Sequence, residues 1–187
     1  MLSAALAILS EAKNLVRIRL LLLTIAAVAA CSPEPQTDNG DYQNVMAFDS
    51  ARVRLVGPRD TLQLSVELAL SAEQKSMGLM ERRTLGPTSG MLFVYDSTQP
   101  PTAGFWMFRT RIPLDIAFID STGVIRAVRS MTPCQSEMSA SCPTYTPDVP
   151  YQYALETNPG LLAQHGIAVG HTAVLSDLTT AKARPNR

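Results

Sequence analysis

The chain has no excess of either charge: its 187 residues include 16 basic and 16 acidic side chains, so the formal net charge is zero. Binding to a nucleic-acid backbone needs a clustered basic surface. The basic pairs here, Arg82 with Arg83 and Arg126 with Arg129, are too small to form one, so we expect no nucleic-acid partner. The sequence also lacks a nucleophile elbow, a zinc signature, a phosphate-binding loop and a dinucleotide fingerprint. No motif of this kind assigns a reaction, and we expect no cofactor and no metal.

A long hydrophobic run is also lacking. The apolar stretch Leu20–Ala30 is much shorter than the roughly 20 residues that a membrane-spanning helix needs. Basic residues precede it and small residues end it, as in a secretory signal, which we place at residues 1–30. Val-Ala-Ala-Cys at its end resembles the lipobox of bacterial lipoproteins, which implies that Cys31 is acylated and becomes the first mature residue. Several acyl chains on Cys31 would give stable anchoring. The alternative is an ordinary cleaved signal with a chance cysteine.

A polar segment rich in Pro, Asn and Asp follows, and residues 31–50 are predicted to be the lipidated cysteine and a flexible tether. Ser32 stands where a retention signal for the inner membrane would carry Asp, which permits sorting to an outer membrane. We therefore expect an exported lipoprotein that faces the periplasm or the cell exterior. Residues 51–178 would form a single globular domain, and residues 179–187 a short tail.

Cysteine is scarce, with three in the chain. If Cys31 carries lipid, Cys134 and Cys142 remain as a pair in an oxidising compartment. They lie in a Pro-rich stretch without periodicity, which needs a covalent link to be ordered. Because a redox pair usually has C-x-x-C spacing and zinc needs four ligands, we predict a structural disulfide.

The apolar pattern predicts a mainly β fold of the α+β class. Period-two alternation and short apolar runs between turn residues predict strands over 51–56, 62–70, 91–95, 105–108, 115–120, 124–131, 151–157 and 173–175. Ser71 with Gln74 is a capping-box signature that opens a short helix to about Arg83, and residues 161–164 form one helical turn. Since no regular βαβ alternation occurs, we expect a compact, antiparallel, partly closed, barrel-like sheet.

Five short motifs carry a resemblance: Gly78-Leu79-Met80-x-Arg82, Gly90-Met91-Leu92-Phe93, Phe105-Trp106-Met107, Pro113-Leu114-Asp115 and Ala154-Leu155-Glu156. In order and spacing they resemble the bacterial and archaeal family named domain of unknown function 192, over about Val53–Leu175. The resemblance implies a compact β-rich domain, often exported or lipid-anchored, with no established activity. Arg109 replaces the Asn typical of the family, and His171 stands where the family usually has Asp. A site that relies on either of those residues is in doubt here.

Trp106 is the single tryptophan. It is interpreted as a core aromatic, with an aromatic platform for a sugar or another flat ligand as the functional alternative. Strand alternation places Trp106 and Phe108 on one face and Phe105 and Met107 on the other, so that one of these faces could line a pocket. The ligand-binding candidates are Trp106, Arg109, Thr110, Asp115 and Arg82.

Two carboxyl groups lie in apolar strands and are the catalytic candidates. Asp115 needs a partner if it is buried, and an arginine such as Arg82, Arg109 or Arg111 is expected. Glu156 poses the same question. Together they could form a glycosidase-type pair, which requires carboxylates roughly 5–10 Å apart. The commoner role is a structural ion pair or a cap on backbone N–H groups.

Methionine is a soft ligand for copper, and four methionines could serve in this way with His165 or His171: Met77, Met80, Met91 and Met107. Methionine is also ordinary core filler, and the first two fit one helix face. The leading interpretation is therefore a non-catalytic, lipid-anchored envelope module that binds a small molecule, a glycan or an envelope protein. A glycan-type hydrolase using Asp115 and Glu156 is one alternative, and methionine-based copper handling is another.

Overall fold

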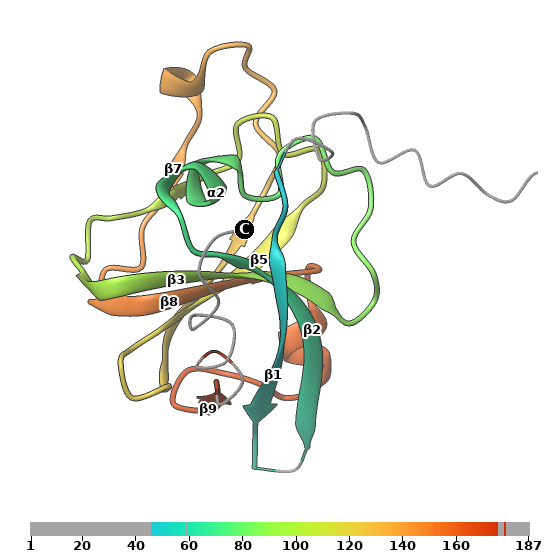
Figure 1. The fold of residues 1–187 in the computed structure, drawn as a ribbon, viewed down its shortest axis with the longest axis vertical. Helices are drawn as coiled ribbons and strands as arrows, with labels where there is room; N and C mark the ends of the chain where they lie inside the picture. The colour runs from blue at the N-terminus through green and yellow to red at the C-terminus, as the bar shows by residue number, and fades with distance from the viewer. Residues whose placement is uncertain (1–45, 59, 176–177, 179–187) are drawn as a thin grey trace, which may run out of the picture. The chain divides into compact units, whose positions relative to one another are not determined.

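The computed structural model describes residues 46–58, 60–175 and 178, and in this part of the chain β-strands dominate (Figure 1). The elements are β1 (Asp49–Val56), β2 (Thr61–Ala69), α2 (Ala72–Met77), β3 (Ser89–Gln99), β4 (Phe105–Trp106), β5 (Leu114–Ile119), β6 (Ile125–Met131), the 3-10 turn η2 (Ser139–Ser141), β7 (Thr144–Tyr145), β8 (Tyr151–Thr157), α3 (Leu161–Gln164) and β9 (Thr172–Val174). The signal predicted at residues 1–30, the lipid site Cys31, most of the tether and the tail 179–187 lie outside the described residues.

The main sheet has the strand order β6-β5-β8-β3-β2-β1-β9 and is strongly curled into a half-barrel. The mainly β fold class predicted from the sequence is thus confirmed. One pairing differs from the expected antiparallel arrangement, because β2 and β3 run parallel. A parallel pair needs a crossover connection, and the segment that contains α2 supplies it.

The curl brings the two edges of this sheet together. Val124, just before β6, forms an isolated bridge with Thr172 of β9. Beside it, the Gly170 N–H donates to the carbonyl of Ile125 over 2.9 Å. The edge strands are therefore linked at one end, which makes the half-barrel partly closed and removes part of an exposed strand edge.

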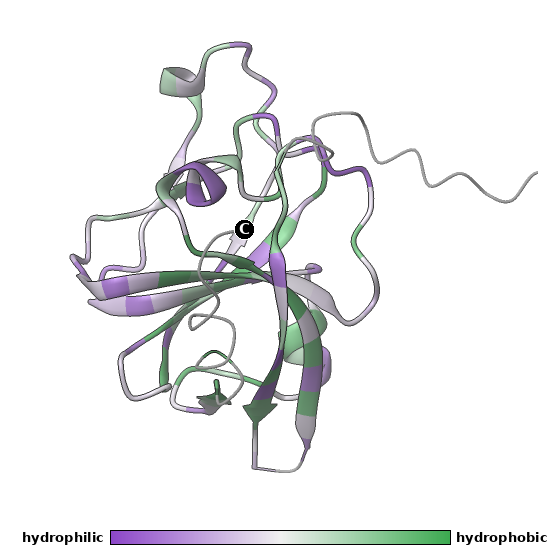
Figure 2. Cartoon of the chain, viewed as in Figure 1, coloured by the Kyte–Doolittle hydropathy of each residue, from purple (hydrophilic) through white to green (hydrophobic). Residues whose placement is uncertain are grey.

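The sheet buries side chains on both faces. The face enclosed by the curl, here called the enclosed face, carries alternating residues such as Leu64, Leu92 and Leu155, and α3 packs against it through Leu161. Figure 2 shows this alternation along β2. The opposite face, here called the site face, carries Met91, Phe93, Ile116, Phe118 and Ala154.

The site face is covered by the region around α2, β4 and β7, which lie on the other side of β3 and β8 from β9 (Figure 1). Leu79 and Met107 from this covering layer pack into the same core cluster. Strand β5 is buried along its whole length, because it has a packed layer on each face.

Helix α2 is shorter than the sequence predicts. Its capping box is present as expected: the Gln74 N–H donates to Ser71 Oγ over 3.2 Å, and the Ser71 N–H donates to Gln74 Oε1 over 3.0 Å. The helix ends at Gly78, whose φ of 50° is costly for other residues, and does not continue to Arg83. The residues after Gly78 turn across the site face instead.

The strands differ from the prediction mainly at their ends. Strand β3 extends to Gln99, beyond the predicted end at Tyr95, whereas β4 ends at Trp106. The short partner of β4, strand β7, has no apolar pattern and was not predicted.

Candidate ligand-binding site

A cavity of about 280 Å³ opens between the site face and the layer that covers it. Its residues come from α2 and the turn after it, from β3, β4, β7 and β8, and from two connections. They are Lys75, Ser76, Met77, Gly78, Leu79, Met80, Phe93, Tyr95, Gly104, Phe105, Trp106, Thr110, Thr144 and Glu156. Apolar rings and a few polar groups thus converge in one concave space, which is the usual character of a small-molecule site.

Glu156 is the buried acid of this cavity. It lies in β8, with Met91 of β3 on one side and Ile116 of β5 on the other, so its side chain shares the site face with theirs. Only 4% of the residue is exposed, and no group of the described residues donates a hydrogen bond to its carboxyl. Burial alone raises the pKa of Glu156 to about 8. The sequence singled out this residue; its isolation is a finding of the structure.

Aromatic rings form the wall around Glu156. Phe93 and Phe105 meet edge to face with ring centroids 4.9 Å apart, and the ammonium of Lys75 lies 5.1 Å from the centroid of Tyr95. Burial raises the pKa of Tyr95, and the nearby Glu156 carboxyl adds to that shift. The alternation of the predicted strand 91–95 already placed Phe93 and Tyr95 on one face, and this signal could have identified them as lining residues.

Trp106 does not lie in the core. It is 44% exposed and lines the mouth of the cavity, so the core interpretation is wrong. The cause is the end of β4 at this residue: Phe105 turns inward, and Trp106 is left at the rim. A half-exposed indole beside a cavity is available to stack on a ligand.

Two glycines allow the walls of the cavity to approach each other. A Cβ on Gly78 would come within 3.3 Å of Cζ of Phe93, and one on Gly104 would lie 2.6 Å from Cγ2 of Thr144. The second distance is shorter than real Cβ contacts, so β4 and β7 can pair here only because residue 104 has no side chain.

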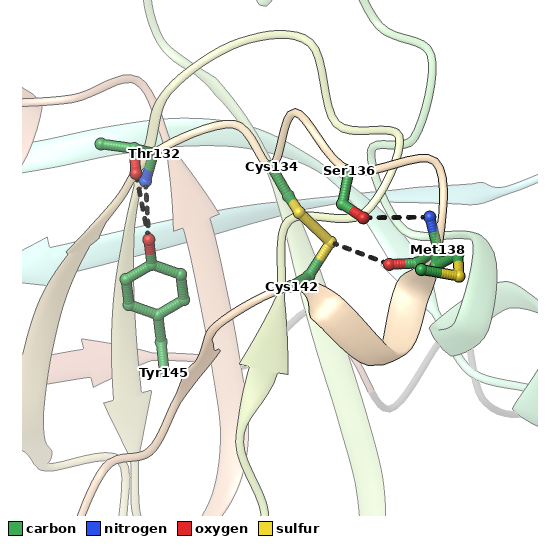
Figure 3. The surroundings of a disulfide bond; sticks show 6 residues. All are labelled: Thr132, Cys134, Ser136, Met138, Cys142 and Tyr145. Carbon is green, nitrogen blue, oxygen red and sulfur yellow. Dashed lines mark hydrogen bonds between the residues drawn. A yellow bond between two sulfur atoms is a disulfide. The ribbon is translucent and has the colours of Figure 1, made fainter.

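The predicted disulfide is present and holds one wall of the site. Cys134 and Cys142 are bonded, and the chain between them forms a small loop with η2 (Figure 3). The Cys134 N–H donates to the carbonyl of Met107 over 3.2 Å, directly after β4. Cys142 lies two residues before Thr144 of β7, and Tyr145 accepts a hydrogen bond from the Thr132 N–H at its hydroxyl. The bond thus links both strands of the wall that carries Trp106.

Asp115 lies on the opposite face of the sheet from Glu156. It is across from Thr157 in the β5–β8 pairing, whereas Glu156 is across from Ile116. Neighbouring residues of a strand point to opposite faces, so the two carboxyl groups do not converge on one substrate. The glycosidase-type pair is not assembled.

Among the described residues, no arginine pairs with Asp115, contrary to the expectation. Its carboxylate accepts hydrogen bonds from the Ser130 hydroxyl over 2.6 Å and from the Gly160 N–H, at the start of α3, over 2.7 Å. Neutral donors satisfy this buried acid without a counter-ion. Its role in the structure is to fix α3 to the sheet.

The comparisons place the chain in a family. The model of DUF192, described as "Uncharacterized ACR", matches residues 55–175. The chain belongs to this family.

Two solved structures are similar to it. A protein from Sinorhizobium meliloti 1021, described provisionally as a transcription regulator, is 35% identical with a TM-score of 0.62, and the match covers 69% of this chain and 95% of that one. A protein of unknown function from Novosphingobium aromaticivorans DSM 12444 is 28% identical with a TM-score of 0.60, covering 79% and 94%. No curated protein matches the chain.

Arg109, for which the family resemblance led us to expect Asn, is held by Glu81. Its φ of 56° is in the left-handed region that Asn adopts more readily than Arg. The Glu81 N–H donates to the Arg109 carbonyl over 2.7 Å, and Arg109 Nε donates to Glu81 Oε1 over 2.7 Å. Burial opposes ionisation of Glu81, but hydrogen bonds from Arg109 and Arg111 outweigh it and lower its pKa. Arg109 therefore supports the turn beside Thr110 of the cavity.

The remaining arginine candidate, Arg82, lies outside this cavity. It pairs with Glu67, which belongs to the same sheet face on β2. Of the five ligand-binding candidates, the structure thus brings Trp106 and Thr110 to the cavity and places the others elsewhere.

The methionine set proposed for copper does not gather with imidazoles. Met91 and Met107 are fully buried core residues, while Met77 and Met80 line the cavity. His165 bonds to Asp60, and His171 accepts the Ala168 N–H. In the described part of the chain, His, Cys, Asp and Glu form no group of three that could hold a metal ion, and no helix there is long and apolar enough to cross a membrane.

Proposed function

We propose that this protein is a tethered cell-envelope domain that binds a small ligand in the site-face cavity and performs no reaction on it. The observation that carries the proposal is Glu156, a buried acid that lines an aromatic-walled cavity and whose carboxyl accepts no hydrogen bond from any residue that the structure describes.

Burial makes the Glu156 carboxyl costly in free energy. Glu156 is 4% exposed and lines the cavity, and removing a carboxyl from water is costly unless hydrogen-bond donors compensate it. A ligand that supplies the missing donor recovers this cost on binding. Such a defect is expected at a functional site, where local consistency gives way to ligand recognition.

A non-catalytic role fits the arrangement of acids better than hydrolysis. Glycoside hydrolysis uses two carboxyl groups on either side of one bond, and Asp115 lies on the other face, engaged by Ser130 and Gly160. The Sinorhizobium meliloti relative is described provisionally as a transcription regulator. The zero net charge of this chain gives no electrostatic basis for binding nucleic acid, so we propose no such role for it.

The cell-envelope location rests on the lipobox-like sequence at Cys31 and on the Cys134–Cys142 disulfide, since disulfides persist mainly in oxidising compartments. The described chain also enters the domain next to the site: the carbonyl of Ala47 accepts a hydrogen bond from Gln74 Nε2 of α2 over 2.9 Å.

Ligand binding is tested by a ligand-observed NMR screen of polar aromatic, amine and sugar fragments against the full protein. Hits at the proposed site are lost with Trp106→Ala and weakened with Glu156→Gln. They persist with Glu137→Gln, a control that removes one exposed acid from the disulfide loop. A screen whose hits ignore both cavity variants would refute the site.

The anchor is tested separately by metabolic labelling with an alkyne fatty-acid analogue. The wild-type protein is expected to be labelled and the Cys31→Ser variant is not. A Cys31→Ser protein that still carries label would exclude Cys31 as the lipid site without affecting the binding proposal.

A further inference from the structure

We infer that the ligand of the site-face cavity carries a primary ammonium group attached to an apolar, flat body. The ammonium would contact the Glu156 carboxylate, and the body would lie against the rings at the cavity mouth. This inference rests on the proposed function and specifies the ligand class.

The Glu156 carboxyl needs hydrogen-bond donors that the described residues do not provide. Its carboxyl accepts no hydrogen bond from the described residues and lies at the base of the cavity. A buried carboxylate needs hydrogen-bond donors, and a compensating charge stabilises its ionised form further. A primary ammonium supplies the two together, because its three N–H bonds make charge-assisted hydrogen bonds. A quaternary ammonium has the charge but no donor, and a hydroxyl has the donor but no charge.

The second argument is the aromatic wall. Ring faces attract ammonium groups electrostatically, and this wall already does so, because Lys75 Nζ lies 5.1 Å from the Tyr95 centroid. The Lys75 ammonium also donates to the carbonyl of Leu70. Lys75 is thus engaged by the Leu70 carbonyl and the Tyr95 ring.

Among the titratable groups around the cavity, we expect Glu156 to be the one that pairs with an ammonium ligand and changes its protonation. Lys75 of α2 and Tyr95 of β3 line the same cavity, and the phenol of Tyr95 has a raised pKa. On the same sheet face, Glu67 of β2 is paired with Arg82.

Two further charged groups belong to the strands and turns around the site. Arg129 of β6, across from Ile116, bonds to Asp148 and to backbone carbonyls. Glu81, in the turn after α2, is paired with Arg109 and Arg111. Each of these charges has a partner, whereas Glu156 has none among the described residues.

Binding is therefore coupled to a proton. With a pKa of about 8, most Glu156 side chains in the empty cavity are protonated at pH 7, while the ammonium selects the ionised form. The fraction of protein with ionised Glu156, which is the form that binds the ammonium, then rises about 50-fold from pH 6 to pH 8. At pH 7, close to one proton is released per ligand bound. A neutral ligand binds either form of the carboxyl and releases no proton.

The experiment compares 2-phenylethylamine with its neutral isostere 2-phenylethanol by isothermal titration calorimetry on the full protein. The titrations are made at pH 6, 7 and 8, in two buffers of different ionisation enthalpy, to count protons. We expect the amine to bind at least 10-fold more tightly than the alcohol at pH 8. Its affinity should rise steeply with pH, and one proton should be released at pH 7.

Variants separate the charge from the shape of the cavity. Glu156→Gln keeps the volume and should lower amine affinity at least 10-fold while abolishing proton release, and Glu137→Gln should change neither. Lys75→Met removes a like charge at the rim and should raise amine affinity.

Equal affinity for the alcohol, or amine binding without proton release, would overturn the ammonium inference. In both cases the cavity still binds a ligand and the proposed function stands. If neither compound binds while the fragment screen gives hits lost in Trp106→Ala, the ammonium inference alone fails. If that screen also gives none, the proposed function fails with it.

Discussion

Replacing Glu156 by glutamine should change how the stability of the fold depends on pH. The carboxyl is buried between Met91 and Ile116 with no donor from the described residues, so its charged form is costly in the folded state and free of that cost in the unfolded chain. Glutamine has nearly the same shape and does not titrate. The difference in unfolding free energy between the two proteins therefore isolates the titration of this group.

The sign follows from the raised pKa. Glu156 titrates at about 8 when folded and at about 4.5 when unfolded, so between these values the folded state holds the extra proton. The stabilisation is complete below pH 4.5 and is lost as the pH rises through 8. Over pH 5 to 8 the wild type should lose about 3.5 kcal/mol relative to Glu156→Gln, since each pKa unit corresponds to about 1.36 kcal/mol.

The assay is urea unfolding followed by tryptophan fluorescence at pH 5, 6.5 and 8. Met91→Leu is the matched control, because it changes a residue directly across from Glu156 without a titratable group. Its unfolding free energy should differ from the wild type by a constant amount at all three pH values. If the Glu156→Gln difference is constant as well, the carboxyl does not titrate at raised pH and the reasoning about its isolation is refuted.

Three other substitutions test separate parts of the structure. Replacing Cys134 and Cys142 together by alanine should cost about 2–3 kcal/mol in urea unfolding, whereas a wild-type protein unaffected by a reductant would show that the bond contributes nothing. Hydrogen bonds and Arg126 outweigh burial and lower the pKa of Asp120 to about 2. Its stabilisation is therefore present above pH 3.8 and lost as the pH falls through 2, and Asp120→Asn should cost about 1–2 kcal/mol at pH 7; a cost that persists unchanged at pH 2 would contradict this. Gly104→Ala forces a clash with β7, so it should lower the free energy of unfolding by about 1–3 kcal/mol. It should also weaken fragment binding in the NMR screen. Unaltered chemical shifts of the β7 amides would contradict the clash.

The elements that the sequence predicted well are those specified by neighbours in the chain. Ser71 and Gln74 form the predicted capping box because both partners lie within one helical turn. The alternation of β2 predicted which of its side chains are buried, since period two follows from backbone geometry alone. Gly78 ends α2, and a glycine is a local signal for the end of a helix that could be seen in the sequence. The spacing of Met77 and Met80 on one helix face led instead to a predicted helix as far as about Arg83.

The partners of charged residues were predicted poorly. An arginine was expected for Asp115, and the structure instead provides Ser130 from β6 and the backbone of Gly160. The arginines bond to Glu81 and Glu67. Charge complementarity allows many pairings in a sequence, and only the register of the strands selects among them.

Local sequence patterns were enough to predict the family, the mainly β class and the pairing of Cys134 with Cys142, two cysteines only eight residues apart. Two features came from the packing of distant segments: no described residue donates a hydrogen bond to the Glu156 carboxyl, and Trp106 lies at a cavity mouth. Both features depend on segments that are far apart along the chain, so local sequence patterns do not predict them. Glu156 is isolated because β8 inserts between β3 and β5. Trp106 is exposed because β4 ends at this residue, beside β7, a strand that no apolar pattern marks.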